Sequence, residues 1–363
     1  MHIVHVIATL DPDWGGPPMV ATRLAAAQAA LGHEVGILSY PAPGRDAEVA
    51  TMVEGVPGFD AVTRRTVQPR GLIDQLGGRS VGEACTAWPT SIDVMHIHGI
   101  WEPILPAAAR WARRCGVPYV VMPHGMLAPW CMRQKALKKQ VALRLGWRQM
   151  LNSAAFLHVL TENERRSIDL QGLRPRSEII PNGIFAEEVA ELPPAGAFRA
   201  RFPELEGRRF ILFLGRLHHQ KGTDYLIEAF GQMAPDLPDV DLVVAGPDDG
   251  EASTMRERSE RLGLRDRVHI VGPLWGTAKY EALVDAACFC LPSLQEGFSI
   301  AITEALACGL PVVVSEACHY DSVEEVGAGV VAPLEATAVA AGLRRVLADA
   351  EAAARMGAAG HRL

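Results

Sequence analysis

The 363-residue sequence lacks several patterns, and each absence excludes a class of protein. No apolar run approaches the about 20 residues that span a bilayer, and no regular period indicates a repeat protein. The seven cysteines are odd in number and scattered, which fits neither a disulfide ladder nor a zinc pattern, so we expect reduced thiols. Residues 1–10 lack a basic n-region and are expected to be structural, not a secretory signal.

Acidic residues are absent from one long stretch. Between Pro103 and Thr161 there is no Asp or Glu, whereas nine Lys or Arg occur. The formal net charge of the whole chain is -7, but the charge is unevenly distributed. Residues 1–182 contain 19 Lys and Arg against 15 Asp and Glu, whereas residues 183–363 contain 16 against 27. The basic block favours an anionic partner, which is nucleic acid, an anionic membrane surface or a phosphorylated substrate. A solvated basic helix face is the alternative.

The length, the composition and the order of apolar segments predict a two-domain α/β protein. The length favours two domains, and a composition of 49% apolar and 21% charged residues is that of a globular chain. Short apolar segments alternate with helical patterns, as in parallel sheets with crossover helices. The seam predicted at Pro181–Ile184 gives an N-terminal Rossmann-like domain, 1–182, and a C-terminal one, 183–363. We expect both domains to be doubly wound and to face each other across a cleft.

The expected elements are as follows. Strands are predicted in the first half at 2–8, 34–39, 92–98, 118–122, 155–159 and 177–180, with helices at 18–31, 104–115, 132–151 and 162–171. Residues 41–90 resist assignment. The second half has predicted strands at 209–215, 240–245, 267–271, 287–291, 311–314 and 329–332.

Three segments could carry chemistry. Gly15 and Gly16 follow a strand and precede a helix, so the backbone there can approach a phosphate, although an ordinary turn is the alternative. Arg216 and Lys221 follow the first strand of the second half, where a guanidinium and an ammonium suit a diphosphate. A solvated loop is the bland alternative for these two cations.

The segment from Glu296 to Glu304 is the most informative of the three. Glu304 is the only charged residue between Gly297 and Ser315, and a carboxylate in such an apolar setting needs a dedicated partner. A helix that begins near Ser299 would present its N-terminus to an anion between the two carboxylates. The alternative is one solvent-facing and one salt-bridged glutamate.

Several histidines and aspartates are weaker candidates for functional residues. His96 and His98 alternate on a strand, which allows a metal site, but no nearby cysteine or acidic cluster completes it. His124 ends a strand on the cleft side and is either functional or a structural hydrogen-bonding group. The pairs Asp11/Asp13 and Asp239/Asp241 have a D-x-D form, and we interpret them as loop or cap residues.

Together these residues resemble the retaining glycosyltransferases of family 4, which have the GT-B fold. The resemblance covers nearly the whole chain and rests on the order and spacing of short motifs. These are the glycine pair at 15–16, PHGM at 123–126, TENE at 161–164, PNG at 181–183, GRLHHQKG at 215–222 and EGFSIAITE at 296–304.

The resemblance implies a donor-binding role for most of these positions. Arg216 and Lys221 would bind the diphosphate of a nucleotide sugar, Glu296 the transferred sugar, and Glu304 the ribose. The distal phosphate would meet the amides of Ser299 and Ile300, with those of Gly297 and Phe298 beside the sugar. Gly15 and Gly16 would approach the diphosphate from the other domain, and His124 would lie near the sugar.

The resemblance further implies a hexosyltransferase that needs no metal and no cofactor. The acceptor would be a glycan or a lipid-linked molecule, in cell-surface polysaccharide synthesis. Cations and tryptophans between 130 and 148 on one predicted helix suit a membrane interface, so we expect a cytoplasmic protein at the inner face of the membrane. No nucleic-acid partner is expected, because the aromatic residues do not form a stacking series.

The sequence departs from the family pattern at three places. Ala128 stands where many relatives have an acidic residue, and the usual glycine-rich segment reads Ser315–His319. The chain also stops at residue 363, before the aromatic-containing last helix, so either truncation or a different domain coupling is expected. The alternatives to a transferase are a sugar-nucleotide epimerase or a phosphorylase on the same fold, and a non-enzymatic protein that binds anions or nucleic acid.

Overall fold

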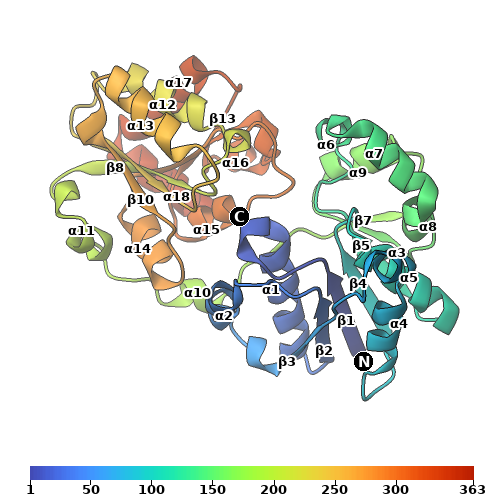
Figure 1. Ribbon diagram of the computed structural model, residues 1–363. Coiled ribbons are helices and arrows are strands. Elements are labelled where there is room, and N and C mark those ends of the chain that lie inside the picture. The colour runs from blue at the N-terminus through green and yellow to red at the C-terminus, as the bar shows by residue number, and fades with distance from the viewer. The chain divides into compact units, whose positions relative to one another are not determined.

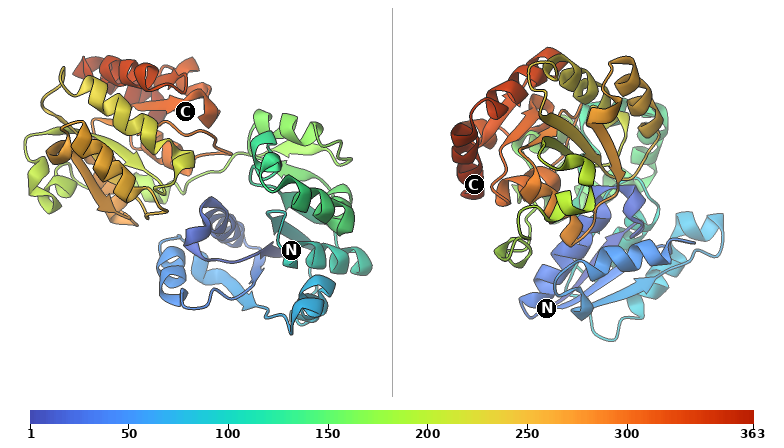
Figure 2. Two further views of the ribbon diagram at one scale, coloured as in Figure 1. Left: turned by 45° about the horizontal axis from the view of Figure 1, so that its top comes forward. Right: turned by 90° about the vertical axis from the view of Figure 1, so that its left-hand side faces the viewer.

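The computed structural model describes residues 1–363, which divide into two compact units, Met1–Asn182 and Gly183–Leu363. Each unit contains one parallel β-sheet with helices packed on it (Figures 1 and 2). The predicted α/β class with two doubly wound domains is confirmed.

The first unit is built on a seven-stranded sheet with the order β3-β2-β1-β4-β5-β6-β7. Six strands lie where the apolar segments predict them, whereas β3 falls in the segment that resisted assignment, because most of its side chains are solvent-exposed. The strands are β1 His2–Ile7, β2 Glu34–Ser39, β3 Val62–Thr66, β4 Val94–His98, β5 Tyr119–Met122, β6 Leu157–Val159 and β7 Ser177–Ile179.

The helices of the first unit connect these strands. They are η1 Pro12–Trp14, α1 Gly16–Ala30, α2 Asp46–Glu54, η2 Phe59–Ala61, α3 Leu72–Gly77, α4 Arg79–Thr86, α5 Ile104–Cys115, α6 Pro129–Arg133, α7 Ala136–Ala142, η3 Leu143–Trp147, α8 Arg148–Asn152 and α9 Glu162–Asp169. α9 begins where Thr161 predicts, and the Thr161 hydroxyl accepts a hydrogen bond from the Glu164 amide at 3.2 Å.

The single helix predicted over 132–151 is wrong, and with it the placement of cations and tryptophans on one helix. The segment is divided into α6, α7, η3 and α8, because Lys135 has φ 50° and Gly146 has φ 116°. An α-helix cannot continue through a residue with positive φ. The helical composition of the segment gave no indication of these breaks.

The second unit contains a six-stranded sheet with the order β10-β9-β8-β11-β12-β13. All six strands lie at the predicted positions, and the burial of five of them explains why they stand out as apolar segments, whereas β10 is only half-buried. They are β8 Arg209–Leu214, β9 Val240–Ala245, β10 Val268–Gly272, β11 Cys288–Leu291, β12 Val312–Ser315 and β13 Gly329–Ala332.

Helices cover both faces of this second sheet. α12, α13 and α17 lie on one face and α14, α15 and α18 on the other (Figure 1). The helices are α10 Glu187–Ala190, α11 Ala197–Arg201, η4 Pro203–Leu205, η5 His219–Lys221, α12 Thr223–Met233, α13 Ala252–Arg261, η6 Arg265–Arg267, α14 Thr277–Asp285, α15 Ile300–Ala307, η7 Glu316–Cys318, α16 Ser322–Glu325, α17 Ala336–Leu347 and α18 Ala350–His361.

Each sheet has one point where the strand order reverses. In the first unit this point lies between β1 and β4, and in the second it lies between β8 and β11. At such a switch point the loops after the two central strands diverge to opposite faces, and the space between their ends is where open α/β sheets bind ligands. The loops after these four strands are therefore the places to examine for a site.

Candidate functional site

Lys221 and Glu296 meet at the switch point of the second sheet. Lys221 follows β8 and Glu296 follows β11, and the Lys221 Nζ lies 2.7 Å from Glu296 Oε1. The same carboxylate oxygen accepts a hydrogen bond from the Ser293 hydroxyl at 2.5 Å. The Glu296 residue is only 8% exposed, so this is a nearly buried ion pair at the carboxyl end of the sheet.

Gly222 allows the Lys221 loop to approach the loop after β11. Its φ is 71°, and a Cβ there would lie 1.7 Å from the carbonyl oxygen of Pro292. The Leu294 amide donates to the Gln220 carbonyl at 2.8 Å and joins the two loops. Only glycine fits this position, because both the backbone conformation and the contact exclude a side chain.

Arg216 also has a carboxylate partner. Its guanidinium lies 2.7 Å from Asp249 Oδ2, and both side chains are partly exposed. Arg216 and Lys221 thus both follow β8, and each is paired with a carboxylate that the sequence does not indicate.

The first turn of α15 offers free backbone amides beside this pair. Gly297, Phe298 and Ser299 lead into the helix, which begins at Ile300 close to the predicted start. Ser299 occupies the N-cap position but its side chain makes no capping hydrogen bond. The amides of the first turn therefore have no partner from the cap side chain, and the helix dipole favours an anion there.

Glu304 has the dedicated partner that its apolar surroundings require. Lys279, on α14, places its Nζ 2.6 Å from Glu304 Oε1. Glu304 is 4% exposed, and the Lys279 side chain is 16% exposed. The alternative of one solvent-facing and one paired glutamate is wrong, because Glu296 and Glu304 are both buried and both paired with a lysine.

Gly15 and Gly16 open the first helix of the other unit, as predicted. Gly15 has φ 87°, and a Cβ added to Gly16 would meet no atom within 4 Å. Asp11 caps η1 by accepting from the Asp13 amide, which fits its predicted role. Asp241, in contrast, lies inside β9 and is fully buried. It binds Arg208 at 2.6 Å, so its role is structural.

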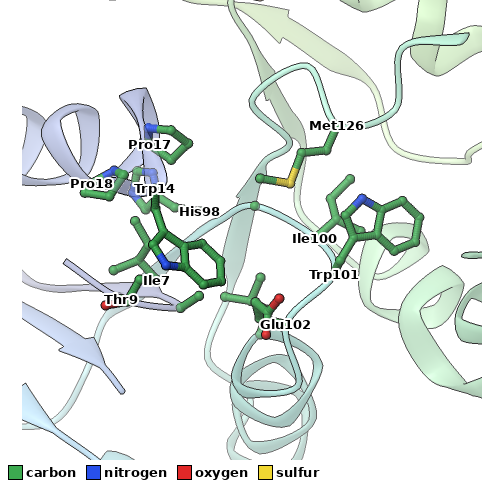
Figure 3. A pocket seen from close by; sticks show the side chains of 13 residues that line it. Ile7, Thr9, Trp14, Pro17, Pro18, His98, Ile100, Trp101, Glu102 and Met126 are labelled. Atoms are coloured by element: carbon green, nitrogen blue, oxygen red, sulfur yellow. The ribbon is translucent and has the colours of Figure 1, made fainter. Parts of the chain in front are cut away.

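A pocket of about 150 Å³ lies at the switch point of the first sheet. Figure 3 shows Trp14 and Trp101 on two sides of it, with Glu102 and Met126 nearby. Burial raises the pKa of Glu102, and the nearby Lys138 ammonium opposes this shift. The lining residues are Ile7, Ala8, Thr9, Trp14, Pro17, Pro18, His98, Gly99, Ile100, Trp101, Glu102, Leu105 and Met126. The pocket is therefore largely apolar, with aromatic walls and one carboxylate.

His124 follows β5 and has an unusual backbone. Its φ is 54°, a region that non-glycine residues rarely adopt and that often marks functional positions. Glu164 holds this turn in place, because its carboxylate accepts from the Gly125 amide at 2.5 Å and the Leu160 amide at 2.8 Å. Burial raises the pKa of Glu164, and these two hydrogen bonds oppose the shift. The Thr161–Glu164 spacing therefore indicated a helix start but not this second role.

Histidine nitrogens gather on one face of the first sheet. The ligand atoms of His5, His96 and His98 lie within 4.8 Å of one another, and all three residues are buried. His5 was not among the predicted candidates, because a single histidine in an apolar strand carries no signal of its neighbours. His96 and His98, whose alternation allows a metal site without completing it, thus gain a third imidazole but no acidic ligand.

The basic segment, residues 130–148, exposes apolar side chains together with its cations. Leu137, Val141 and Leu145 are 80%, 46% and 69% exposed. Lys139 lies with its Nζ 5.1 Å above the ring of Trp101, so this segment contacts the wall of the pocket. None of the helices combines the length and the apolar character required to cross a bilayer.

Profiles of two protein families match the chain. The profile described as glycosyl transferase 4-like domain matches residues 15–183. The profile described as glycosyl transferases group 1 matches residues 196–363. Each profile thus covers most of one unit.

Two curated relatives illustrate the sequence similarity. The phosphatidyl-myo-inositol mannosyltransferase of Mycobacterium leprae (strain TN) is 27% identical over 227 residues, which are 62% of this chain and 55% of that protein. The Escherichia coli UDP-Gal:alpha-D-GlcNAc-diphosphoundecaprenol alpha-1,3-galactosyltransferase is 29% identical over 233 residues, 61% of this chain and 57% of that protein. The chain spans just over half the length of these relatives.

Solved structures match along the whole chain. The sucrose-phosphate synthase from Thermosynechococcus elongatus has a TM-score of 0.78 at 21% identity, covering 100% of this chain and 93% of that one. Anabaena Alr3699/HepE in complex with UDP and glucose also has a TM-score of 0.78, at 20% identity, covering 100% of this chain and 94% of that one. The likeness shows the fold, and the expected GT-B architecture is confirmed.

Proposed function

Because the chain belongs to the glycosyl transferases group 1 family, we propose that it is a retaining hexosyltransferase that uses a nucleotide-diphosphate sugar. The observation that carries the proposal is the Lys221–Glu296 pair beside the free N-terminus of α15. A cation, a polyol-binding carboxylate and a helix N-terminus meet there at a switch point, and these groups suit the diphosphate and hydroxyls of such a donor.

On this proposal, cationic side chains hold the diphosphate of the donor and carboxylates hold its hydroxyls. Lys221 has three ammonium protons, so it can bind the diphosphate while it still donates to Glu296. Arg216 adds a second cation, and the amides of Ser299 and Ile300 receive the distal phosphate. Glu296 orients hydroxyls of the transferred sugar, with the amides of Gly297 and Phe298 beside it. On this proposal Glu304 accepts from the ribose hydroxyls, and Lys279 pairs with the same carboxylate at 2.6 Å.

The reaction needs stabilisation of the leaving diphosphate. As the bond from the anomeric carbon to the phosphate oxygen breaks, negative charge grows on the nucleoside diphosphate. Arg216, Lys221 and the α15 dipole are aimed at that charge, an electrostatic device that replaces a divalent cation. The acceptor hydroxyl attacks the same face, and its proton passes to the leaving phosphate oxygen, so no separate base and no cofactor are required.

The pocket of the first unit supplies the acceptor side. Trp14 and Trp101 offer aromatic faces for a pyranose ring or an apolar group, and Glu102 can accept from hydroxyls. Lys138 and Lys139 adjoin the same pocket through Glu102 and Trp101. An apolar pocket with cations at its edge supports an acceptor sugar linked to a lipid through an anionic phosphate group, as in polysaccharide synthesis.

The basic segment provides a surface for the lipid. Leu137, Val141 and Leu145 recur every fourth residue and are exposed beside Lys135 and Arg144. Exposed leucines next to cations suit the interface of an anionic membrane, where the side chains enter the headgroup layer. Cosedimentation with vesicles that contain phosphatidylglycerol should pellet the protein, and Leu137→Ser with Leu145→Ser should weaken pelleting. Equal pelleting with phosphatidylcholine vesicles would contradict the role of the cations.

One experiment tests the transferase proposal. Purified protein is incubated with UDP- and GDP-sugars and a panel of lipid-linked or glycan acceptors, and products are read by proton NMR. We expect a new α-linkage from an α-donor and release of the nucleoside diphosphate in the presence of EDTA. Inversion at the anomeric carbon would contradict the retaining mechanism. Conversion of the donor sugar without an acceptor would favour an epimerase.

A further inference from the structure

Five histidines of the first unit form two hydrogen-bonded rows beside its sheet. His5 lies on β1, His96 and His98 on β4, and His158 on β6, while His124 follows β5. His5 is paired with His96 in the β1–β4 register, which places both on the same face of the sheet. Only the row that ends at His124 reaches a residue of the candidate site.

This first row runs from α1 to His124. Gln28 Oε1 lies 2.8 Å from His5 Nε2, His5 Nδ1 lies 2.9 Å from His98 Nε2, and His98 Nδ1 lies 3.1 Å from His124 Nε2. The ring centroids are 5.2 and 5.3 Å apart in the two histidine pairs. Such separations, with N···N contacts this short, place the rings edge to edge, with each nitrogen aimed at the next ring.

This geometry disfavours the metal interpretation of the cluster. Metal ligands must aim their lone pairs at one common point. Here both nitrogens of His5 and both nitrogens of His98 are already directed at partners along the row. The nitrogens therefore serve as links in a hydrogen-bonded chain.

Each ring of the chain is neutral. Burial lowers the pKa of His5 to about 4 and that of His124 to about 3, and it holds the pKa of His98 well below its ordinary value. A neutral imidazole has one N–H donor and one acceptor nitrogen. In a row of neutral rings, the direction of the first hydrogen bond therefore fixes the direction of every other one.

Gln28 is the group that fixes this direction. Its carbonyl oxygen faces His5, so His5 must donate from Nε2 and accept through Nδ1. His98 then donates from Nε2, and His124 donates from its own Nε2 in turn. The proton of His124 is thus on Nε2, and its Nδ1 carries a lone pair.

The second row provides an internal control. His158 Nε2 lies 2.8 Å from the backbone carbonyl of Ile180, and His158 Nδ1 lies 3.3 Å from His96 Nε2. A carbonyl only accepts, so the direction of this row cannot be reversed by a side-chain change at Gln28.

We propose that Gln28 is a positioning residue that, through His5 and His98, holds His124 in the tautomer whose Nδ1 accepts a hydrogen bond from a sugar hydroxyl. The identity of the hydroxyl rests on the proposed function, whereas the tautomer does not. The left-handed backbone of His124 supports the assignment, because such a conformation persists where the surrounding structure enforces one geometry.

The test combines nitrogen NMR of histidine-labelled protein with kinetics. In the wild-type protein, His5, His98 and His124 are expected as neutral Nε2–H tautomers near neutral pH. Gln28→Met has similar volume but no acceptor, so we expect mixed tautomers in these three residues, with His96 and His158 unchanged. Gln28→Glu retains a group that only accepts and should restore the Nε2–H form.

Transfer kinetics give the second readout. Gln28→Met should lower kcat about fivefold, as expected for one weakened hydrogen bond, and Gln28→Glu should recover it. An Nδ1–H tautomer of His124 in the wild type, or an unchanged tautomer in folded Gln28→Met, would overturn the proposal. Mixed tautomers with unchanged kcat would overturn the role toward the hydroxyl. If the wild type transfers no sugar, the proposed function fails, while the NMR result still decides the tautomer.

Discussion

The two units share one sheet design but use different chemistry at its switch point. At the carboxyl edge of the second sheet, partly exposed lysines pair with buried carboxylates, at 2.7 Å for Lys221–Glu296 and 2.6 Å for Lys279–Glu304. At the same edge of the first sheet lie neutral imidazoles and an apolar pocket with aromatic walls. The difference indicates that one scaffold can hold an anionic ligand on one unit and a largely uncharged one on the other.

The largest expected effect breaks the ion pair of the second unit. Lys221→Ala should lower kcat about 1000-fold, because it removes a cation aimed at the charge of the leaving diphosphate. Steady-state transfer kinetics measure this effect. Arg265→Gln is the matched control, since Arg265 pairs with Glu260 only at the exposed surface and its loss should leave kcat unchanged. A rate of Lys221→Ala within a few-fold of wild type would show that the pair has no part in the reaction.

The next effect concerns stability in acid, which should fall more in the first unit than in the second. His5, His96 and His98 are buried, and burial lowers the pKa of each below 6.5. Below pH 6.5 the unfolded chain binds protons that the folded unit excludes, so the free energy of unfolding falls as the pH falls. For His5 this fall in stability takes place between pH 6.5 and about pH 4. At about pH 5.5 the loss is roughly 1 kcal/mol for His5, and His96 and His98 act in the same direction.

Hydrogen exchange at about pH 7 and about pH 5.5, corrected for intrinsic rates, measures this difference. Protection of β1 and β4 should fall, while that of β8 and β9 should change little. His218 and His319 of the second unit also have a lowered pKa, but both are only partly buried and contribute less. The raised pKa of Glu164 acts in the opposite direction and offsets part of the loss near pH 5 and below. Equal loss of protection in both units would contradict the contrast.

A smaller effect is expected at the second ion pair. Glu304→Gln should raise the donor KM about tenfold with little change in kcat, because ribose contacts are the same in the ground and transition states. Lys279→Met should have the same effect, since it leaves the buried carboxylate without its partner. A fall in kcat at unchanged KM would instead place Glu304 near the reacting atoms.

The smallest effect is expected at the acceptor pocket. Trp14→Ala removes one exposed aromatic wall and should raise the acceptor KM about threefold, through the loss of a single stacking contact. The donor KM should stay the same, and this separation is the informative part of the measurement. A change in the donor KM alone would assign the pocket to the donor.

The sequence predicts the sheets better than the segments between them. Strands such as β8 and β11 are nearly continuous apolar runs, because both faces of a parallel sheet are covered, and such runs are easy to recognise. The segment 132–151 has helical composition throughout, but the positive φ of Lys135 and Gly146 divides it. A lysine in a left-handed conformation has no sequence signal.

The candidate site was predictable where it depends on motifs and not where it depends on partners. Glu304 stands out because it is the only charge in a long apolar stretch, and this predicts that a partner exists. Lys279, the partner, lies 25 residues away on another helix, so tertiary packing alone selects it. The same holds for Gln28 and His5, whose roles depend on the neighbours that the sheet order brings together.

The most direct test of the account is calorimetric titration of the protein with UDP and with GDP in the presence of EDTA. The account predicts that one of the two nucleotides binds without a divalent cation. It further predicts that Lys221→Ala weakens this binding at least about tenfold, the loss expected for a charge-assisted contact to phosphate. Absence of binding by both nucleotides, or unchanged affinity in folded Lys221→Ala, would contradict the central claim that the second unit holds the diphosphate through Lys221.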